Sequence, residues 1–264
     1  MKKNLTFALF FIAFLANAQE VTFVTDNDRE TTDYYLLKSH SYTYIKNNEI
    51  SLFWNKDKIE KQNSLAGANF KDPFLGNIHH FDERSPLRRL AFYKNTQYLV
   101  LLDNHLSEVG RLSLLEKFPE LTAVYAALTT KAGIWLFDEN SNRWCILNSF
   151  NDQPKMVSNP IVNYQYLTSD GNYAYWQNNT KVYGIDMYGK LIKEHILPEN
   201  AQMLAINQNK IVYQLNNNVF LFNTENNEKQ KLEEISEPVE KAIFGAEFLI
   251  IFTNDKIYTY HIKF

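Results

Sequence analysis

The first candidate for chemistry is the segment His79-His80-Phe81-Asp82-Glu83, which contains two histidines and two carboxylates. Side chains next to each other on a strand point to opposite faces, so these two histidines cannot easily bind one ion. A zinc site needs three or four ligands that converge on the metal. We therefore expect neither a metal site nor a cofactor in this segment.

Three arginines follow at once and form the only dense cationic cluster in the chain after its first residues. Arg84, Arg88 and Arg89 could contact a partner, because a guanidinium binds a carboxylate or phosphate through paired hydrogen bonds. The alternative is a solvated loop in which the arginines form local ion pairs with Asp82 and Glu83. We take the three arginines as a candidate partner-contact patch and keep the ion pairs as the alternative.

Other signatures of catalysis are missing from the sequence. It has no glycine-rich phosphate loop, no nucleophile elbow and no paired metal motif. Cys145 is the only cysteine, and its place in the apolar run 144–147 predicts a buried thiol rather than a nucleophile. We therefore predict no catalytic residues and a protein that is not an enzyme. A propeller active site built from distant residues remains an alternative.

The first 18 residues have the pattern of a secretory signal peptide. Lys2 and Lys3 precede the apolar run 5–15, and the small residues of 16–18 follow it. The apolar run is shorter than the roughly 20 residues of a transmembrane helix, and no later stretch reaches that length. We expect export to the periplasm, where association with the outer membrane is one option. Residues 19–264 then form a single domain without a direct transmembrane span.

Composition also limits the partners. The formal net charge is -3 and the sequence pI is about 6.1, so the chain lacks the basic character of a nucleic-acid-binding protein. We expect a protein partner in the outer membrane or periplasm and no nucleic acid. The oligomeric state is left open.

The secondary structure that must hold these candidate residues in place is predicted to be almost entirely β-strand. Short aromatic and branched runs alternate with Asn and Asp clusters, as in 41–46 and 50–54 with Asn47 and Asn48 between them. Asn tolerates positive φ, so such pairs can form tight hairpins without glycine. The one predicted helix is Ser113 to Leu121, which Pro119 limits and which could equally be a loop.

An apolar strand that ends in an Asp or Asn turn recurs along the chain. The turn residues are Asn55, Asp103, Asp138, Asp186 and Asn223, and a last copy spans 257–261. Spacings of roughly 35–48 residues are typical of a four-stranded propeller blade. The sequence therefore predicts an all-β propeller of about six blades, with Val21 to Val24 pairing with the final blade to close the ring.

The alternative fold is an outer-membrane β-barrel. Tyr258, Tyr260, Ile262 and Phe264 alternate at the end of the chain, as barrel strands do. Against it, the run 248–252 is apolar on both faces, whereas a barrel strand alternates apolar and polar residues.

Residues 85–93, 98–103 and 133–138 resemble a group of exported β-propeller-like proteins that are common in Bacteroidota. The shared pattern is a Pro-Leu-aromatic strand, an apolar strand ending in Leu-Asp, and a Trp-Phe-Asp strand in the next unit. The resemblance covers about residues 78–150 and concerns structural positions only. It implies a periplasmic propeller and brings no catalytic residues.

The leading functional hypothesis is a non-catalytic periplasmic interaction or scaffold protein, an accessory subunit of an outer-membrane assembly or protein-secretion complex. The second is a carbohydrate-binding or carbohydrate-active propeller. Its candidate sugar platforms are Trp54, Trp135, Trp144 and Trp176, although each lies in an apolar strand where core packing is expected. The third hypothesis follows from the alternative fold and is an outer-membrane β-barrel.

Overall fold

The computed structural model describes residues 21–26, 31–37, 41–46, 48–54, 65–85, 87–232, 235, 237–245, 248–253 and 256–262. The predicted signal peptide, residues 1–18, lies outside this set, as does the predicted turn residue Asn55. The domain assignment of 19–264 therefore stays a prediction.

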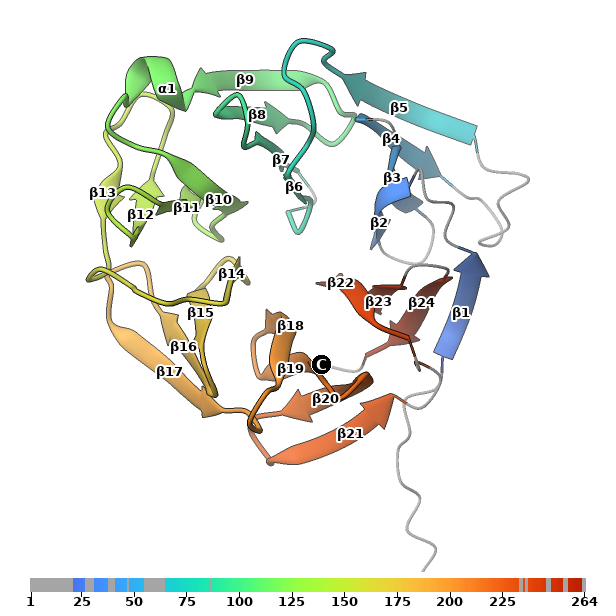
Figure 1. Ribbon diagram of the computed structural model, residues 1–264. Helices are drawn as coiled ribbons and strands as arrows, with labels where there is room; N and C mark the ends of the chain where they lie inside the picture. The colour runs from blue at the N-terminus through green and yellow to red at the C-terminus, as the bar shows by residue number, and fades with distance from the viewer. Residues whose placement is uncertain are drawn as a thin grey trace, which may run out of the picture.

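The strands form six antiparallel sheets of four strands each, arranged as a ring (Figure 1). Blade 1 contains β2 (Thr31–Leu37), β3 (Ser41–Lys46), β4 (Glu49–Trp54) and β5 (Leu65–Lys71), and blade 2 contains β6 (His80–Asp82), β7 (Arg89–Tyr93), β8 (Tyr98–Leu102) and β9 (Glu108–Ser113). Blade 3 contains β10 (Ala123–Leu128), β11 (Ile134–Asp138), β12 (Arg143–Leu147) and β13 (Lys155–Met156), and blade 4 contains β14 (Tyr166–Ser169), β15 (Ala174–Asn178), β16 (Lys181–Ile185) and β17 (Leu191–Ile196). Blade 5 contains β18 (Gln202–Asn207), β19 (Lys210–Leu215), β20 (Asn218–Asn223) and β21 (Glu228–Leu232), and blade 6 contains β22 (Val239–Phe244), β23 (Phe248–Thr253), β24 (Lys256–His261) and β1 (Val21–Asp26).

The predicted fold class is confirmed: the protein is an all-β propeller of four-stranded blades. The first strand of blades 1 to 5 and β22 of blade 6 face the middle of the ring (Figure 1). The alternative of an outer-membrane barrel is wrong, because the strands pair into six separate sheets rather than one closed sheet.

The ring is closed by the N-terminal strand. β1 pairs antiparallel with β24, from Val21 opposite Tyr260 to Asp26 opposite Lys256, and so supplies the outer strand of blade 6 (Figure 1). This pairing is the one predicted for Val21 to Val24. It gives β24 a partner on both sides and covers an edge that would otherwise be open to other chains.

The recurring turn residues do not all occupy the same place in a blade. Asp103, Asp186 and Asn223 follow or end the third strand of their blades, whereas Asp138 ends the second strand of blade 3. Treating Asp138 as equivalent was wrong. The second and third strands of a blade are both packed between neighbouring blades, so both are apolar and their turns look alike in sequence.

The carboxylates of these turns bond to the backbone that follows them. Asp103 Oδ1 accepts from the amides of His105 and Ser107, both at 2.8 Å. Asp186 Oδ1 accepts in the same way from Tyr188 and Lys190, both at 2.9 Å. An Asp at this position therefore shapes the turn, which explains why the residue recurs with the blade.

The core lies between the blades. Every residue of β10 and β11 is buried, and one apolar cluster joins strands of blades 2 and 3. Cys145 belongs to that cluster, so the predicted burial of its thiol is confirmed, and this burial raises the pKa of the thiol to about 12. The predicted helix is present but short: α1 (Leu114–Lys117) joins blades 2 and 3, and the Ser113 hydroxyl accepts from the Glu116 amide at 3.2 Å.

Two turn glycines offer a matched test of packing between blades. Gly189 and Gly76 both have positive φ, of 82° and 77°. A Cβ on Gly189 would lie 1.8 Å from the carbonyl oxygen of Val157 in the neighbouring blade, whereas a Cβ on Gly76 would meet nothing within 4 Å.

We expect Gly76→Ala to lower the free energy of unfolding by about 1–2 kcal/mol, the usual cost of the left-handed conformation. Gly189→Ala should lower it by at least about 1 kcal/mol more, because the backbone of Val157 must move. Urea unfolding of the two variants measures both values. Equal losses would show that the turn of Gly189 does not pack against blade 3 as described.

Candidate functional site

The candidate site lies on the face of the ring that carries the loops between the first and second strands of the blades. We call this the AB face and define it by residues 83–85 and 87–88 of blade 2 and by the loops 129–133, 170–173 and 208–209 of blades 3 to 5. A pocket of about 430 Å³ opens among the first three of these loops. Blade 2 contributes Arg84, Ser85 and Arg88 to it, and blades 3 and 4 contribute residues from 128–132 and 170–171.

Arg84, one of the residues that line the pocket, forms an ion pair with Asp82. Asp82 Oδ1 accepts from the Arg84 amide at 3.1 Å and from its Nε at 2.8 Å, and Oδ2 accepts from its Nη2. The Asp82 side chain is 1% exposed. Desolvation alone would raise the pKa of Asp82, but the charge and hydrogen bonds of Arg84 outweigh it and hold the pKa at about 2.

The same pair ties three blades together. Asp82 Oδ2 also accepts from the Leu128 amide of blade 3 at 2.8 Å. Arg84 donates from Nη2 to the carbonyl of Leu128 at 3.2 Å and from Nη1 to the carbonyl of Ser169, in blade 4, at 2.6 Å. All three nitrogens of the Arg84 guanidinium are therefore occupied by the protein itself, which makes this arginine part of the framework.

Further hydrogen bonds extend the connection to blade 5. The Thr130 hydroxyl donates to Asn172 Oδ1 at 2.9 Å, between blades 3 and 4. Asp170 Oδ1 accepts from the amides of Asn172 and Tyr173, and Oδ2 accepts from the Tyr175 hydroxyl at 2.8 Å and from the Gln208 amide of blade 5 at 3.2 Å. The AB loops of four consecutive blades thus form one bonded series.

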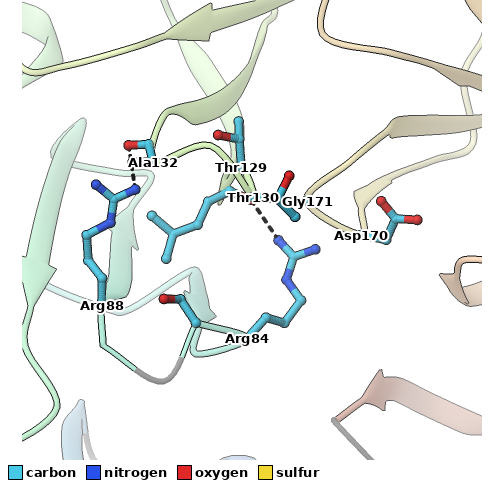
Figure 2. A pocket seen from close by; sticks show the side chains of 9 residues that line it. Arg84, Arg88, Thr129, Thr130, Ala132, Asp170 and Gly171 are labelled. Atoms are coloured by element: carbon cyan, nitrogen blue, oxygen red, sulfur yellow. Dashed lines mark hydrogen bonds between the residues drawn. The ribbon is translucent and has the colours of Figure 1, made fainter.

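Arg88 is held much more loosely than Arg84. Among the described residues its one hydrogen bond runs from Nη2 to the carbonyl of Ala132, across the pocket mouth to blade 3. No carboxylate of the described residues lies within ion-pair distance of it. Figure 2 shows Arg84 and Arg88 extending from the loop of blade 2, with Thr129 and Ala132 across from them and Asp170 to one side.

Arg89 does not share this surface. It lies in β7, is 3% exposed, and its Nε is 3.8 Å from Glu83 Oε2, while its Nη1 donates to the carbonyl of Asp103 at 2.9 Å. The predicted patch of three arginines therefore needs a correction: only Arg84 and Arg88 reach the AB face. The contact of Arg84 and Arg88 with a partner stays a prediction. The ion pairs that were the alternative are both present, between Arg84 and Asp82 and between Arg89 and Glu83.

Glu83 differs sharply from its neighbour Asp82. Its side chain is 5% exposed, and neither carboxyl oxygen has a hydrogen-bond partner among the described residues. Burial raises the pKa of Glu83 to about 8. Residues 81 and 83 face blade 1, whereas Asp82 faces blade 3, so the alternation of a strand sends adjacent carboxylates into opposite environments.

The two histidines are likewise separated. The His79 ring packs edge-on against Phe92 at 5.9 Å, and the His80 ring lies 5.0 Å from that of Tyr125 in blade 3. Desolvation outweighs the opposing charge of Asp82 and lowers the pKa of His80 to about 4. In the described part of the chain, no three potential ligands converge on a metal position.

A second set of contacts between blades was missed from the sequence. On the face opposite the AB face, the Gln97 amide group bonds to both backbone groups of Ala123, at 2.8 Å each. Gln177 bonds in the same way to the Ala201 carbonyl and the Met203 amide, and Gln214 accepts from the Val239 amide. The only sequence signal is a Gln beside a hairpin turn, which the surrounding Asn clusters obscure.

The candidate sugar platforms do not reach the pocket. Trp135 and Trp144 are fully buried, and Trp176 stacks on Tyr183 with ring centres 5.2 Å apart while packing against the cluster between blades 3 and 4. The side chain of Trp54 lies outside the described set. No aromatic residue is among those that line the pocket.

No family model matches the sequence, and no curated protein matches it. Solved structures of low identity share the fold. Virginiamycin B lyase from Staphylococcus aureus matches with a TM-score of 0.58 and 12% identity, over 88% of this chain and 80% of its own. BBS1N in complex with ARL6DN matches at 0.55 and 12%, over 93% and 97%. YCF48 bound to D1 peptide matches at 0.54 and 9%, over 94% and 96%.

These neighbours are similar in fold and differ in role, since they include an enzyme and proteins captured with protein or peptide partners. Membership in an exported family of Bacteroidota is therefore still a proposal. The described residues include no helix with the length and apolar character needed to cross a bilayer.

The Asp82 and Arg84 pair predicts a loss of stability in acid. Because the pKa of Asp82 is depressed in the folded state, its contribution is present above about pH 4 and is lost as the pH falls toward about 2. We expect a loss of about 2 kcal/mol over this range that Asp82→Asn does not share. Urea titrations at several pH values measure it. If Asp82→Asn does not fold, the pKa of the Asp82 carboxyl group is measured by NMR in the wild type instead. An ordinary pKa for this carboxyl group would contradict its pairing with Arg84.

Glu83 predicts the opposite pH dependence. Its pKa is raised in the folded state, so its contribution is present below about pH 4.5 and is lost as the pH rises through about 8. We expect the wild type to lose more than about 1 kcal/mol relative to Glu83→Gln between pH 5 and pH 8. Parallel stability curves for the two proteins would contradict the burial of an unbonded carboxyl group.

Proposed function

We propose that this chain is an exported, non-catalytic propeller that binds a protein partner on its AB face. In this proposal it acts in the periplasm as an accessory subunit of an outer-membrane assembly or protein-secretion complex. One observation carries the proposal: hydrogen bonds link the AB loops of blades 2 to 5 in series, and the pocket among the first three of these loops is lined by Arg88, which has donors left for a partner.

The chemistry of the pocket favours binding over catalysis. Asp170 is the only carboxylate among its lining residues, and both of its oxygens already accept two hydrogen bonds from the protein. Asp82, the partner of Arg84, is similarly occupied. A general base needs an oxygen or nitrogen that can reach a substrate proton, and these carboxylates have little capacity left for one.

The surface beside the pocket also supports a protein partner. Leu87 lies in the AB loop of blade 2, between the pocket residues Ser85 and Arg88, and is 76% exposed. An apolar side chain beside an arginine is a common composition for the centre of a protein interface. Export rests on the sequence pattern of residues 1–18, and the class of complex rests on the resemblance over residues 78–150.

The test is affinity purification of a tagged chain from native envelopes, followed by mass spectrometry. Leu87→Ser is compared with Phe74→Ser, because Phe74 is an equally isolated apolar side chain, 89% exposed, in the connection between blades 1 and 2 on the opposite face. We expect the wild type and Phe74→Ser to recover the same envelope protein. Leu87→Ser should recover at least about tenfold less, the effect of losing a central interface contact.

Recovery of the bait alone from all three purifications would contradict the proposal. A loss of the partner with Phe74→Ser and not with Leu87→Ser would contradict the choice of face. A chain found in the cytoplasmic fraction after cell fractionation would contradict export.

A further inference from the structure

The geometry assigns a ligand chemistry to the pocket: we propose that Arg88 binds a carboxylate group of the protein partner. This inference rests on the proposed function and deepens it by naming the group that the AB face recognises. Arg88 then determines specificity, while Arg84 only shapes the pocket.

The first argument is the difference in occupancy between the two arginines. A guanidinium has five N–H donors. Arg84 donates from Nε to Asp82, from Nη1 to the carbonyl of Ser169 and from Nη2 to the carbonyl of Leu128. Arg88 makes one hydrogen bond within the described chain, from Nη2 to the Ala132 carbonyl. That single bond uses one of the two hydrogens on Nη2. The other Nη2 hydrogen, together with that of Nε or with one on Nη1, is available to a ligand in the fork geometry that suits a carboxylate.

The second argument is the local charge. The ion pair with Asp82 compensates the charge of Arg84, and no described carboxylate within ion-pair distance compensates that of Arg88. One unpaired positive charge at a half-buried position favours one negative charge on the ligand. Asp170, which lines the opposite part of the pocket, would repel the second charge of a phosphate dianion. A carboxylate therefore fits better than a phosphate.

The third argument is the remaining lining. The Thr129 hydroxyl oxygen accepts from the Gly133 amide at 2.8 Å, so its hydrogen is available to a second oxygen in the pocket. Ser85, from the loop of blade 2, also lines the pocket. Exposed Leu87 next to Arg88 favours a carboxylate that sits close to an apolar side chain. Either an acidic side chain or a chain terminus of the partner supplies such a group.

The experiment titrates the chain with small probes and follows the backbone amide resonances of residues 128–132 by NMR. The probes are N-acetyl-glutamate α-amide for a side-chain carboxylate, N-acetyl-leucine for a terminal carboxylate, N-acetyl-glutamine amide as the neutral control, and inorganic phosphate. We expect saturable shifts with one or both carboxylates and none with the neutral probe. The tighter carboxylate identifies the source of the group.

Arg88→Gln should weaken carboxylate binding by about tenfold or more, because a charge-assisted hydrogen-bond pair is lost. Arg88→Lys keeps the charge but not the fork and should give an intermediate affinity. The matched control is Lys131→Gln, which removes the same charge from an exposed position in the adjacent loop and outside the pocket lining. We expect the control to retain wild-type affinity.

The inference is overturned by tighter binding of phosphate, by equal binding of the neutral probe, by absence of saturable shifts, or by equal losses from Arg88→Gln and Lys131→Gln. It fails separately from the proposed function. Carboxylate binding without any envelope partner would contradict only the function, and a partner that is retained by Arg88→Gln would contradict only the inference.

Discussion

The arrangement of the AB face depends on one ion pair, between the buried carboxylate of Asp82 and the partly exposed guanidinium of Arg84. A carboxylate at the end of an inner strand is tolerated in the interior only if its charge is paired and its oxygens are bonded. Arg84 pairs with the charge of Asp82 and donates hydrogen bonds to its oxygens. The remaining N–H groups of Arg84 donate to the carbonyls of Leu128 and Ser169. The pairing that permits one buried charge therefore also fixes the relative position of three blades. The pocket is the space that those fixed loops leave between them.

The three arginines of this segment therefore differ in role, although they carry the same chemical group. Arg84 is occupied by the protein, Arg89 is buried beside Glu83, and Arg88 alone remains at the pocket mouth with donors to spare. Loops on a rigid scaffold carry function in many folds, and propellers with little sequence in common support different roles. On the opposite face, the glutamine contacts join blade 2 to blade 3 and blade 4 to blade 5.

Much of the fold follows from the sequence because it depends on local patterns. Apolar strands with Asp or Asn turns at blade spacing predict the propeller, and the N-terminal strand was correctly paired with the final blade. The pattern failed where second and third strands look alike, as at Asp138. The separation of Arg88 from Arg89 follows once β7 is known to begin at Arg89, because every residue of β7 is buried whereas Arg88 lies in the loop before it. The partners of Arg84, 44 and 85 residues away, depend on blade packing and have no local signal.

The most direct test of this account measures hydrogen exchange at the Nε–H groups of the arginines by NMR, with resonances assigned from Arg84→Lys and Arg88→Lys. Arg84 Nε donates to buried Asp82 within the bonded series, so its hydrogen should exchange far more slowly than that of an exposed arginine. Arg88 Nε should exchange at close to the rate of an exposed arginine. Rapid exchange at Arg84, or equal protection of the two groups, would contradict the claim that one arginine builds the face and the other is left to recognise a ligand.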